Sequence, residues 1–239
     1  MVTMNLWLTM GITSLLLGGW SLFQSGKAEA AEPPKPSPNP PPKPAPNVPM
    51  QLAKSTPNVF ISRIEDCVIR QSGSQDAGGR HWMREPLWDA ANDCYARLRY
   101  SDAPAALAKF GFKLAAQADW EALKTASGVT ILEPCTLVSQ QSDFAKMRSL
   151  EFARKHDTCV KAQLDKLGWA GDSVLLNCGK QWLPGAPAGK SINFGWMRTK
   201  AGVNGKGEPR LAGSWIQTPG TAHEAAYTDY SQLTQGIRQ

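Results

Sequence analysis

The residues with the greatest chemical potential lie together near the C-terminus: His223, Tyr227, Asp229 and Tyr230. If residues 221–227 form a helical turn, His223 and Tyr227 point the same way, because residues four apart share a helix face. Imidazole nitrogens and carboxylate oxygens are common zinc ligands. A metallopeptidase would therefore use His223 and Asp229, with a third ligand taken from the remaining histidines, His81 or His156.

The same segment resembles the S-x-H-x-x-G-x-A-x-D box of D-Ala-D-Ala zinc peptidases. It departs from that box in two places, because Ala226 stands where the glycine should be and Asp229 comes one residue early. No Glu-x-x-x-Trp-His sequence follows. The family's ligand set is therefore not carried over, and we expect neither a metal nor a cofactor.

Two other hydrolytic arrangements can be written from the sequence. A cysteine peptidase would pair Cys178 or Cys135 with His223, in the required order of cysteine before histidine. A disulfide at either cysteine would consume the nucleophile.

A glycosidase would need two carboxylates about 5–10 Å apart. Glu85 with Asp89 or Asp93 could supply them. Acidic residues at a helix start are more often dipole-favoured caps, so we favour that structural role. The sequence contains no G-x-x-x-x-G-K-[ST] or G-x-G-x-x-G motif, which leaves no nucleotide-binding signature.

Aromatic residues accompany the reactive cluster. Residues 191–198 and 211–217 are typical of strands, and the Asn204-Gly205 pair between them predicts an antiparallel hairpin. Trp196 and Trp215 would then lie on neighbouring strands. With Tyr227 and Tyr230 they would either fill the core of a small β-layer or form a binding surface for a partner or glycan.

The elements that must position these residues are predicted to be mainly helical. Apolar residues recur at helical spacing in several segments, and short apolar runs at 129–132 and 173–178 indicate strands. The fold class predicted is α+β, with a helical body from Phe60 to Leu167 followed by a small C-terminal antiparallel sheet. The expected helices cover residues 60–70, 87–100, 103–117, 119–124 and 144–167.

Five widely spaced cysteines predict disulfides in place of a metal site, because none forms a C-x-x-C pair. Two bridges and one free thiol allow fifteen connectivities, which the sequence does not separate. Cys67–Cys94 is the favoured pair, since both cysteines would lie on apolar helix faces. The candidates are Cys67, Cys94, Cys135, Cys159 and Cys178.

The N-terminal part divides into a leader (1–30) and a proline-rich spacer (31–58), followed by a globular domain (59–239). Residues 6–23 carry no charge, which suits either a signal-peptide core or a membrane anchor. Ala28-Glu29-Ala30 matches a cleavage site, whereas Trp7 and Trp20 sit where interfacial aromatics of a span belong. Ten of the seventeen residues from 33 to 49 are proline, which predicts an extended spacer on the order of 50 Å long.

A net charge of +6 suits an anionic neighbour. The cations between residues 148 and 166 alternate with acidic residues, so a solvated helix face is favoured and no nucleic-acid partner is expected. In layout the chain resembles bacterial envelope tethers of the energy-transducer type.

These features predict an exported accessory or binding subunit in the cell envelope, periplasmic, secreted or anchored in the inner membrane through residues 6–23. Its partner would be an envelope protein or a cell-wall polymer. The alternative is a peptidoglycan-directed hydrolase that uses the C-terminal His/Asp cluster.

Overall fold

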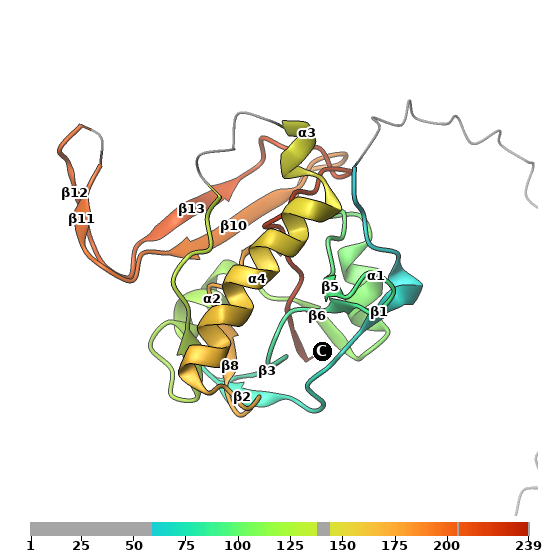
Figure 1. Cartoon of the computed structure of the whole chain (residues 1–239), viewed down its shortest axis with the longest axis horizontal. Helices are drawn as coiled ribbons and strands as arrows, with labels where there is room; N and C mark the ends of the chain where they lie inside the picture. The colour runs from blue at the N-terminus through green and yellow to red at the C-terminus, as the bar shows by residue number, and fades with distance from the viewer. Residues whose placement is uncertain (1–58, 138–143, 205, 239) are drawn as a thin grey trace, which may run out of the picture. The chain divides into compact units, whose positions relative to one another are not determined.

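The computed structural model describes residues 59–137, 144–204 and 206–238 (Figure 1). The predicted leader and spacer lie outside these residues. Within them, no helix is both long enough and apolar enough to span a bilayer.

The described chain is built mainly from short strands, which corrects the predicted fold class. Fourteen strands form five small sheets, and only four α-helices accompany them. The region from Phe60 to Leu167 is therefore not a helical body, because strands β1 to β7 all fall within it.

Two of the predicted helices are replaced by the first sheet. Its strand order is β1–β4–β5, with β1 at Cys67–Val68, β4 at Trp88–Asp89 and β5 at Cys94–Tyr95, preceded by the 3-10 helix η1 at Ile64–Asp66. The turn between β4 and β5 explains why residues 87–100 do not form the predicted helix. The Asp89 carboxylate accepts the backbone N–H of Asn92 at 3.0 Å, and Asp93 adopts a left-handed φ of 52°. This local side-chain hydrogen bond favours a turn over a helix.

The helices are α1 (Ala103–Ala108), α2 (Gln117–Leu123), α3 (Phe144–Met147) and α4 (Leu150–Leu167). The long predicted helix breaks before Ser149, whose hydroxyl caps α4 by accepting the N–H of Phe152. It ends, as predicted, at Gly168, which has a φ of 64°. Helix α4 buries Phe152, His156 and Val160, which are four residues apart and share one face.

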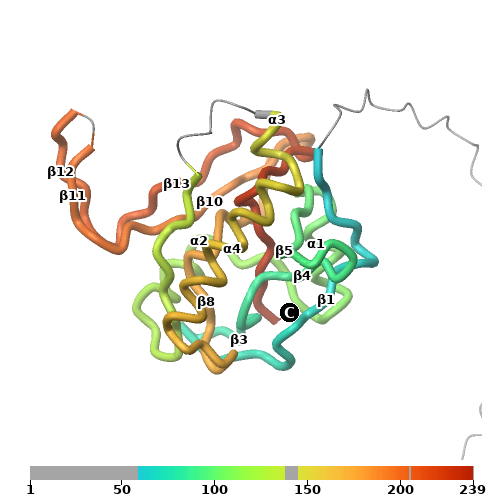
Figure 2. The backbone as a smooth tube through the Cα atoms, in the orientation of Figure 1, coloured from blue at the N-terminus to red at the C-terminus, as the bar shows by residue number. Residues whose placement is uncertain are grey.

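The predicted C-terminal hairpin is confirmed. Strands β9 (Lys180–Leu183), β10 (Ile192–Met197) and β13 (Trp215–Gly220) form an antiparallel sheet in the order β13–β10–β9. Trp215 is paired with Met197, the neighbour of Trp196. Beyond this sheet the hairpin continues as a two-stranded ribbon of β11 (Gly202–Val203) and β12 (Pro209–Arg210), which projects from the body (Figures 1 and 2). Strands β7 (Val129–Ile131) and β8 (Val174–Leu176) pair in parallel.

A C-terminal segment, residues 228–238, runs through the middle of the domain and is buried up to residue 237 (Figure 1). It ends in β14 (Gly236–Arg238), which lies between β3 (Arg80–Trp82) and β6 (Phe112–Leu114) in a sheet completed by β2 (Gln75–Ala77). Its backbone also bonds to three other parts of the chain, through Met147, Lys180 and Leu87. The C-terminal segment therefore holds the sheets and α4 together.

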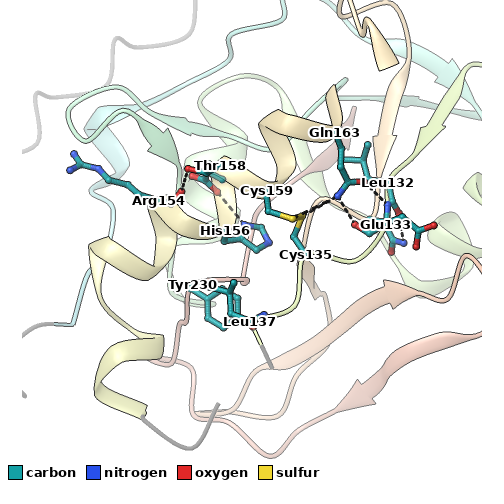
Figure 3. The surroundings of a disulfide bond; sticks show 12 residues. Leu132, Glu133, Cys135, Leu137, Arg154, His156, Thr158, Cys159, Gln163 and Tyr230 are labelled. Carbon is teal, nitrogen blue, oxygen red and sulfur yellow. Dashed lines mark hydrogen bonds and ion pairs between the residues drawn. A yellow bond between two sulfur atoms is a disulfide. The ribbon is translucent and has the colours of Figure 1, made fainter. Parts of the chain in front are cut away.

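One disulfide, Cys135–Cys159, joins the chain after β7 to helix α4, with a Cα–Cα distance of 5.9 Å (Figure 3). The prediction of at least one bridge is confirmed, but the favoured Cys67–Cys94 pair is wrong. Both of these cysteines pair with Asp89 from opposite sides of β4. Two strand spacings separate their Cα atoms by roughly 9–10 Å, beyond the ~7 Å limit for a bridge. Cys67, Cys94 and Cys178 are buried thiols.

Replacing Gly236 tests how tightly β14 is enclosed by its neighbours. A Cβ there would lie 2.6 Å from the Lys113 carbonyl oxygen, so Gly236→Ala should lower the free energy of unfolding by about 1–3 kcal/mol. Gly202→Ala is the matched control, because a Cβ at that position meets nothing within 4 Å. It should change stability by less than about 0.5 kcal/mol in urea unfolding. Equal effects of the two substitutions would contradict the enclosed position of β14.

The disulfide closes a loop with a sequence separation of 24. Replacing both Cys135 and Cys159 by Ala should therefore lower the free energy of unfolding by about 3 kcal/mol, because the unfolded chain gains freedom. Alkylation of the unfolded chain, followed by mass spectrometry, should label three cysteines without reductant and all five with it. Labelling of a peptide containing Cys135 without reductant would show that this bridge does not form.

Candidate functional site

The predicted C-terminal cluster is assembled in the structure. The rings of His223 and Tyr227 are stacked, with centroids 3.8 Å apart and an interplanar angle of 7°. The Tyr227 hydroxyl donates a hydrogen bond of 2.8 Å to Asp229 Oδ2. His223 and Tyr227 face one another as expected, although a turn and not a helix carries them.

Asp229 is the buried centre of this cluster. Its carboxylate pairs with the Lys180 ammonium and accepts hydrogen bonds from both the backbone N–H and the hydroxyl of Ser231, at 2.9 and 2.7 Å. Burial alone would raise the pKa of Asp229, but the Lys180 charge and the hydrogen bonds outweigh it and hold the pKa well below its usual range. The group is therefore a firmly ionised structural anion.

Lys180 was not predicted from the sequence. Its side chain is 9% exposed, and it reaches Asp229 from strand β9, far away in the sequence. An alternation pattern in the short strand β9 would not have identified it, because all four residues of that strand are buried.

His223 lies at the half-buried edge of the cluster. Burial lowers the pKa of its imidazole, and the positive charges of Lys180 and Arg148 lower it further against the opposing effect of Asp229. The ring is therefore neutral near pH 7. His223 is therefore a neutral polar residue that stacks on Tyr227.

The other histidines do not complete a zinc site with His223. His156 is fully buried on α4, where Nδ1 lies 3.1 Å from Asp157 Oδ1, and His81 on β3 pairs with Asp76 on the neighbouring strand β2. No group of three or more potential ligands is gathered among the described residues.

The candidate cysteine nucleophiles are also occupied or enclosed. Cys135 belongs to the disulfide, and Cys178 packs in a buried cluster with Tyr95 and Val160. Burial raises the pKa of the Cys178 thiol well above its usual range, so it stays protonated.

The candidate glycosidase carboxylates make structural contacts. Glu85 is buried, pairs with Arg70 and accepts the Tyr95 hydroxyl at 3.0 Å. Asp89 and Asp93 shape the turn between β4 and β5.

The four aromatic residues of the predicted binding surface are divided between buried and half-buried positions. Trp196 and Tyr230 are buried together with Phe152, and the Tyr230 hydroxyl accepts the N–H of Leu137. Trp215 and Tyr227 are half-buried. This arrangement favours core packing over a broad contact surface.

A second polar network, which was not predicted from the sequence, lies beneath α4. Arg97 is 1% exposed and donates to Asp157 Oδ1 at 2.6 Å and to the carbonyl oxygen of Tyr230 at 2.7 Å. Asp157 Oδ2 in turn accepts the backbone N–H of Tyr95 at 2.8 Å. Burial alone would raise the pKa of Asp157, but the Arg97 charge together with the hydrogen bonds from His156 and Arg97 lowers it below its usual value.

This network borders a cleft of about 620 Å³ between α4 and the first sheet. The Arg70 guanidinium lies 3.6 Å from the centroid of the Trp88 ring and is fixed by Glu85. A depression of similar volume beside α1 has a single aromatic residue, Tyr100, so the aromatic lining distinguishes the cleft. The lining of the cleft includes Arg70, Trp88, Tyr95, Asp157, Thr158 and Trp169.

Comparison of the chain with protein-family models, curated proteins and solved structures finds no match. Function must therefore be inferred from the residues themselves.

Replacing Asp229 tests its role as a structural anion. Asp229→Asn leaves the Lys180 ammonium buried without its counter-charge, so the free energy of unfolding should fall by about 3–5 kcal/mol at pH 7. Asp165→Asn is the control, because it breaks an exposed pair with Lys161 and should cost less than about 1 kcal/mol. A loss for Asp229→Asn no larger than the control's would contradict this role.

The sign of the pH dependence follows from the lowered pKa of Asp229. Its stabilisation is complete above the unfolded-state pKa of about 3.9 and is lost as the pH falls from there toward the folded-state pKa. Urea unfolding of the wild-type protein should show this loss below about pH 4. The Asp229→Asn variant should show a shallower decline over the same range.

Proposed function

We propose that the protein is an exported binding subunit of the cell envelope, and that its ligand is a cell-wall polymer held in the cleft beside α4. The observation that carries this proposal is the cleft's lining. The partly exposed Trp88 and Trp169 supply aromatic surface, and Arg70 is already fixed in position by Glu85.

Such a lining suits a polymer with both rings and charges. Ligand sites combine apolar and aromatic walls with a few fixed polar groups. The planar guanidinium of Arg70 can meet a carboxylate, whereas the exposed Thr158 hydroxyl, which donates its own proton to the Arg154 carbonyl, can accept N–H or O–H donors. Cell-wall glycopeptide offers sugar rings, amides and carboxylates along one chain, so it can use each of these groups.

We favour binding over hydrolysis because the candidate catalytic groups are buried or engaged in structural contacts. Cys178 is buried with a raised pKa, and Asp229 is surrounded by donors. The hydrolase alternative would depend on His223, whose ring is stacked on Tyr227.

Three features support an envelope location. The sequence predicts an apolar leader and a proline-rich spacer, and the domain carries the Cys135–Cys159 disulfide. Disulfides persist mainly in oxidising compartments.

Filling the cleft tests the proposal without disturbing the core. Thr158 is exposed on α4 and lines the cleft, so Thr158→Trp should obstruct it. We expect this variant to bind isolated peptidoglycan sacculi at least about tenfold more weakly than the wild-type full chain, with an unchanged melting temperature. Lys155→Trp is the matched control, because Lys155 is exposed on the same helix but does not line the cleft.

Co-sedimentation with sacculi measures the binding. Equal retention of the Thr158→Trp variant and the wild type, or no retention of the wild type, would contradict the cleft as a wall-binding site. Release of soluble wall fragments by the wild type, lost on His223→Ala, would replace the binding proposal by the hydrolase.

A further inference from the structure

The ribbon of β11 and β12 (residues 199–204 and 206–211) projects from the domain as the outer end of the β10–β13 hairpin (Figures 1 and 2). Its two largest apolar side chains, Val203 and Leu211, are 69% and 71% exposed. These are the two highest exposures among the large hydrophobic residues of the described chain. Exposed apolar groups concentrated in this way mark interaction sites.

The pairing register gives the ribbon two different faces. Val203 is paired with Pro209, and Gly202 with Arg210. Because side chains alternate along extended strands, Val203 and Pro209 share one face, and Ala201 and Leu211, each two residues further along, extend it. The opposite face carries Lys200, Asn204, Glu208 and Arg210. The ribbon is thus amphipathic, with its apolar face exposed to solvent.

Its charge is predominantly positive. Lys200, Lys206 and Arg210 are exposed, and the ribbon's single carboxylate, Glu208, is engaged by the Asn204 side-chain amide. Lys200 makes a long contact of 3.7 Å with Glu133, in which both side chains are mostly exposed and solvent screens the attraction. The ribbon therefore presents cations on the face opposite its apolar strip and at its tip.

We propose that the ribbon docks on an anionic lipid bilayer, with its apolar face in the headgroup region and its cations against the lipid phosphates. An anionic bilayer meets both features, because apolar side chains gain from leaving water and each cation near the surface gains from the negative potential. A soluble polyanion would match only the cations. A second copy would place two cationic ribbons side by side, which is electrostatically unfavourable.

The dimensions fit a shallow contact. Apolar faces of interfacial segments enter only about 5–10 Å below the headgroups, so a two-stranded ribbon is thick enough. The long side chains of Lys200 and Arg210 can extend to the phosphates while their methylene groups cover apolar surface. This docking is independent of the cleft and of residues 6–23.

A position-specific probe tests the proposal in the full chain, where the leader could itself bind membrane. Val203→Cys is labelled with bimane, which the native free thiols resist because they are buried. The labelled protein is mixed with vesicles of phosphatidylcholine and phosphatidylglycerol that carry brominated acyl chains. We expect strong quenching of the bimane, lost in pure phosphatidylcholine and reduced by added salt.

Leu167→Cys is the matched control, because Leu167 is 57% exposed at the end of α4, outside the ribbon. A bimane there should stay unquenched. Exchanging Lys200, Lys206 and Arg210 for Glu should abolish most of the quenching at position 203, with an unchanged melting temperature. No quenching at 203, equal quenching at 203 and 167, or bimane shielding through dimers formed without lipid would each overturn the proposal.

Discussion

The C-terminal segment imposes the main constraint on this domain, because residues 228–237 are polar in sequence yet buried throughout. Buried polar groups are costly unless they are hydrogen-bonded. The side-chain polar atoms of Thr228, Gln232 and Thr234 are buried with no hydrogen-bond partner among the described residues. Asp229 and Gln235 do have partners elsewhere in the chain: Lys180 for Asp229, and the Gln181 side chain and the Met83 carbonyl for Gln235. These partners come from separate elements, so the segment fixes how the elements assemble.

The same bonding joins the two regions of functional interest. The Tyr230 carbonyl oxygen accepts a hydrogen bond from Arg97, which also pairs with Asp157. Asp157 in turn accepts the backbone N–H of Tyr95 beside the cleft. The Tyr95 hydroxyl bonds to Glu85, which in turn fixes Arg70. A cleft held in this way changes little when a ligand arrives, which lowers the entropic cost of binding.

Local signals were predictable from the sequence, whereas long-range partnerships were not. The hairpin carrying Trp196 and Trp215 and the stop of α4 at Gly168 depend on turn and capping residues that act locally. The His223–Tyr227–Asp229 cluster was foreseeable because its members are close in sequence. Residues 94–98 are all buried, so their apolar spacing resembled a helix face although the chain is extended there. Lys180 and Arg97 owe their roles to tertiary contacts, which no spacing rule conveys.

The position of β14 has a consequence for biogenesis. The four-stranded sheet is complete only when residues 236–238 enter between β3 and β6, which come from the first half of the domain. Such non-local pairing makes folding slow, since the intervening chain must be ordered before its contacts form. A nascent chain therefore cannot complete this sheet until residue 238 has been synthesised. If the protein is exported, as proposed, this delay helps to keep the polypeptide competent to be threaded through a translocation pore.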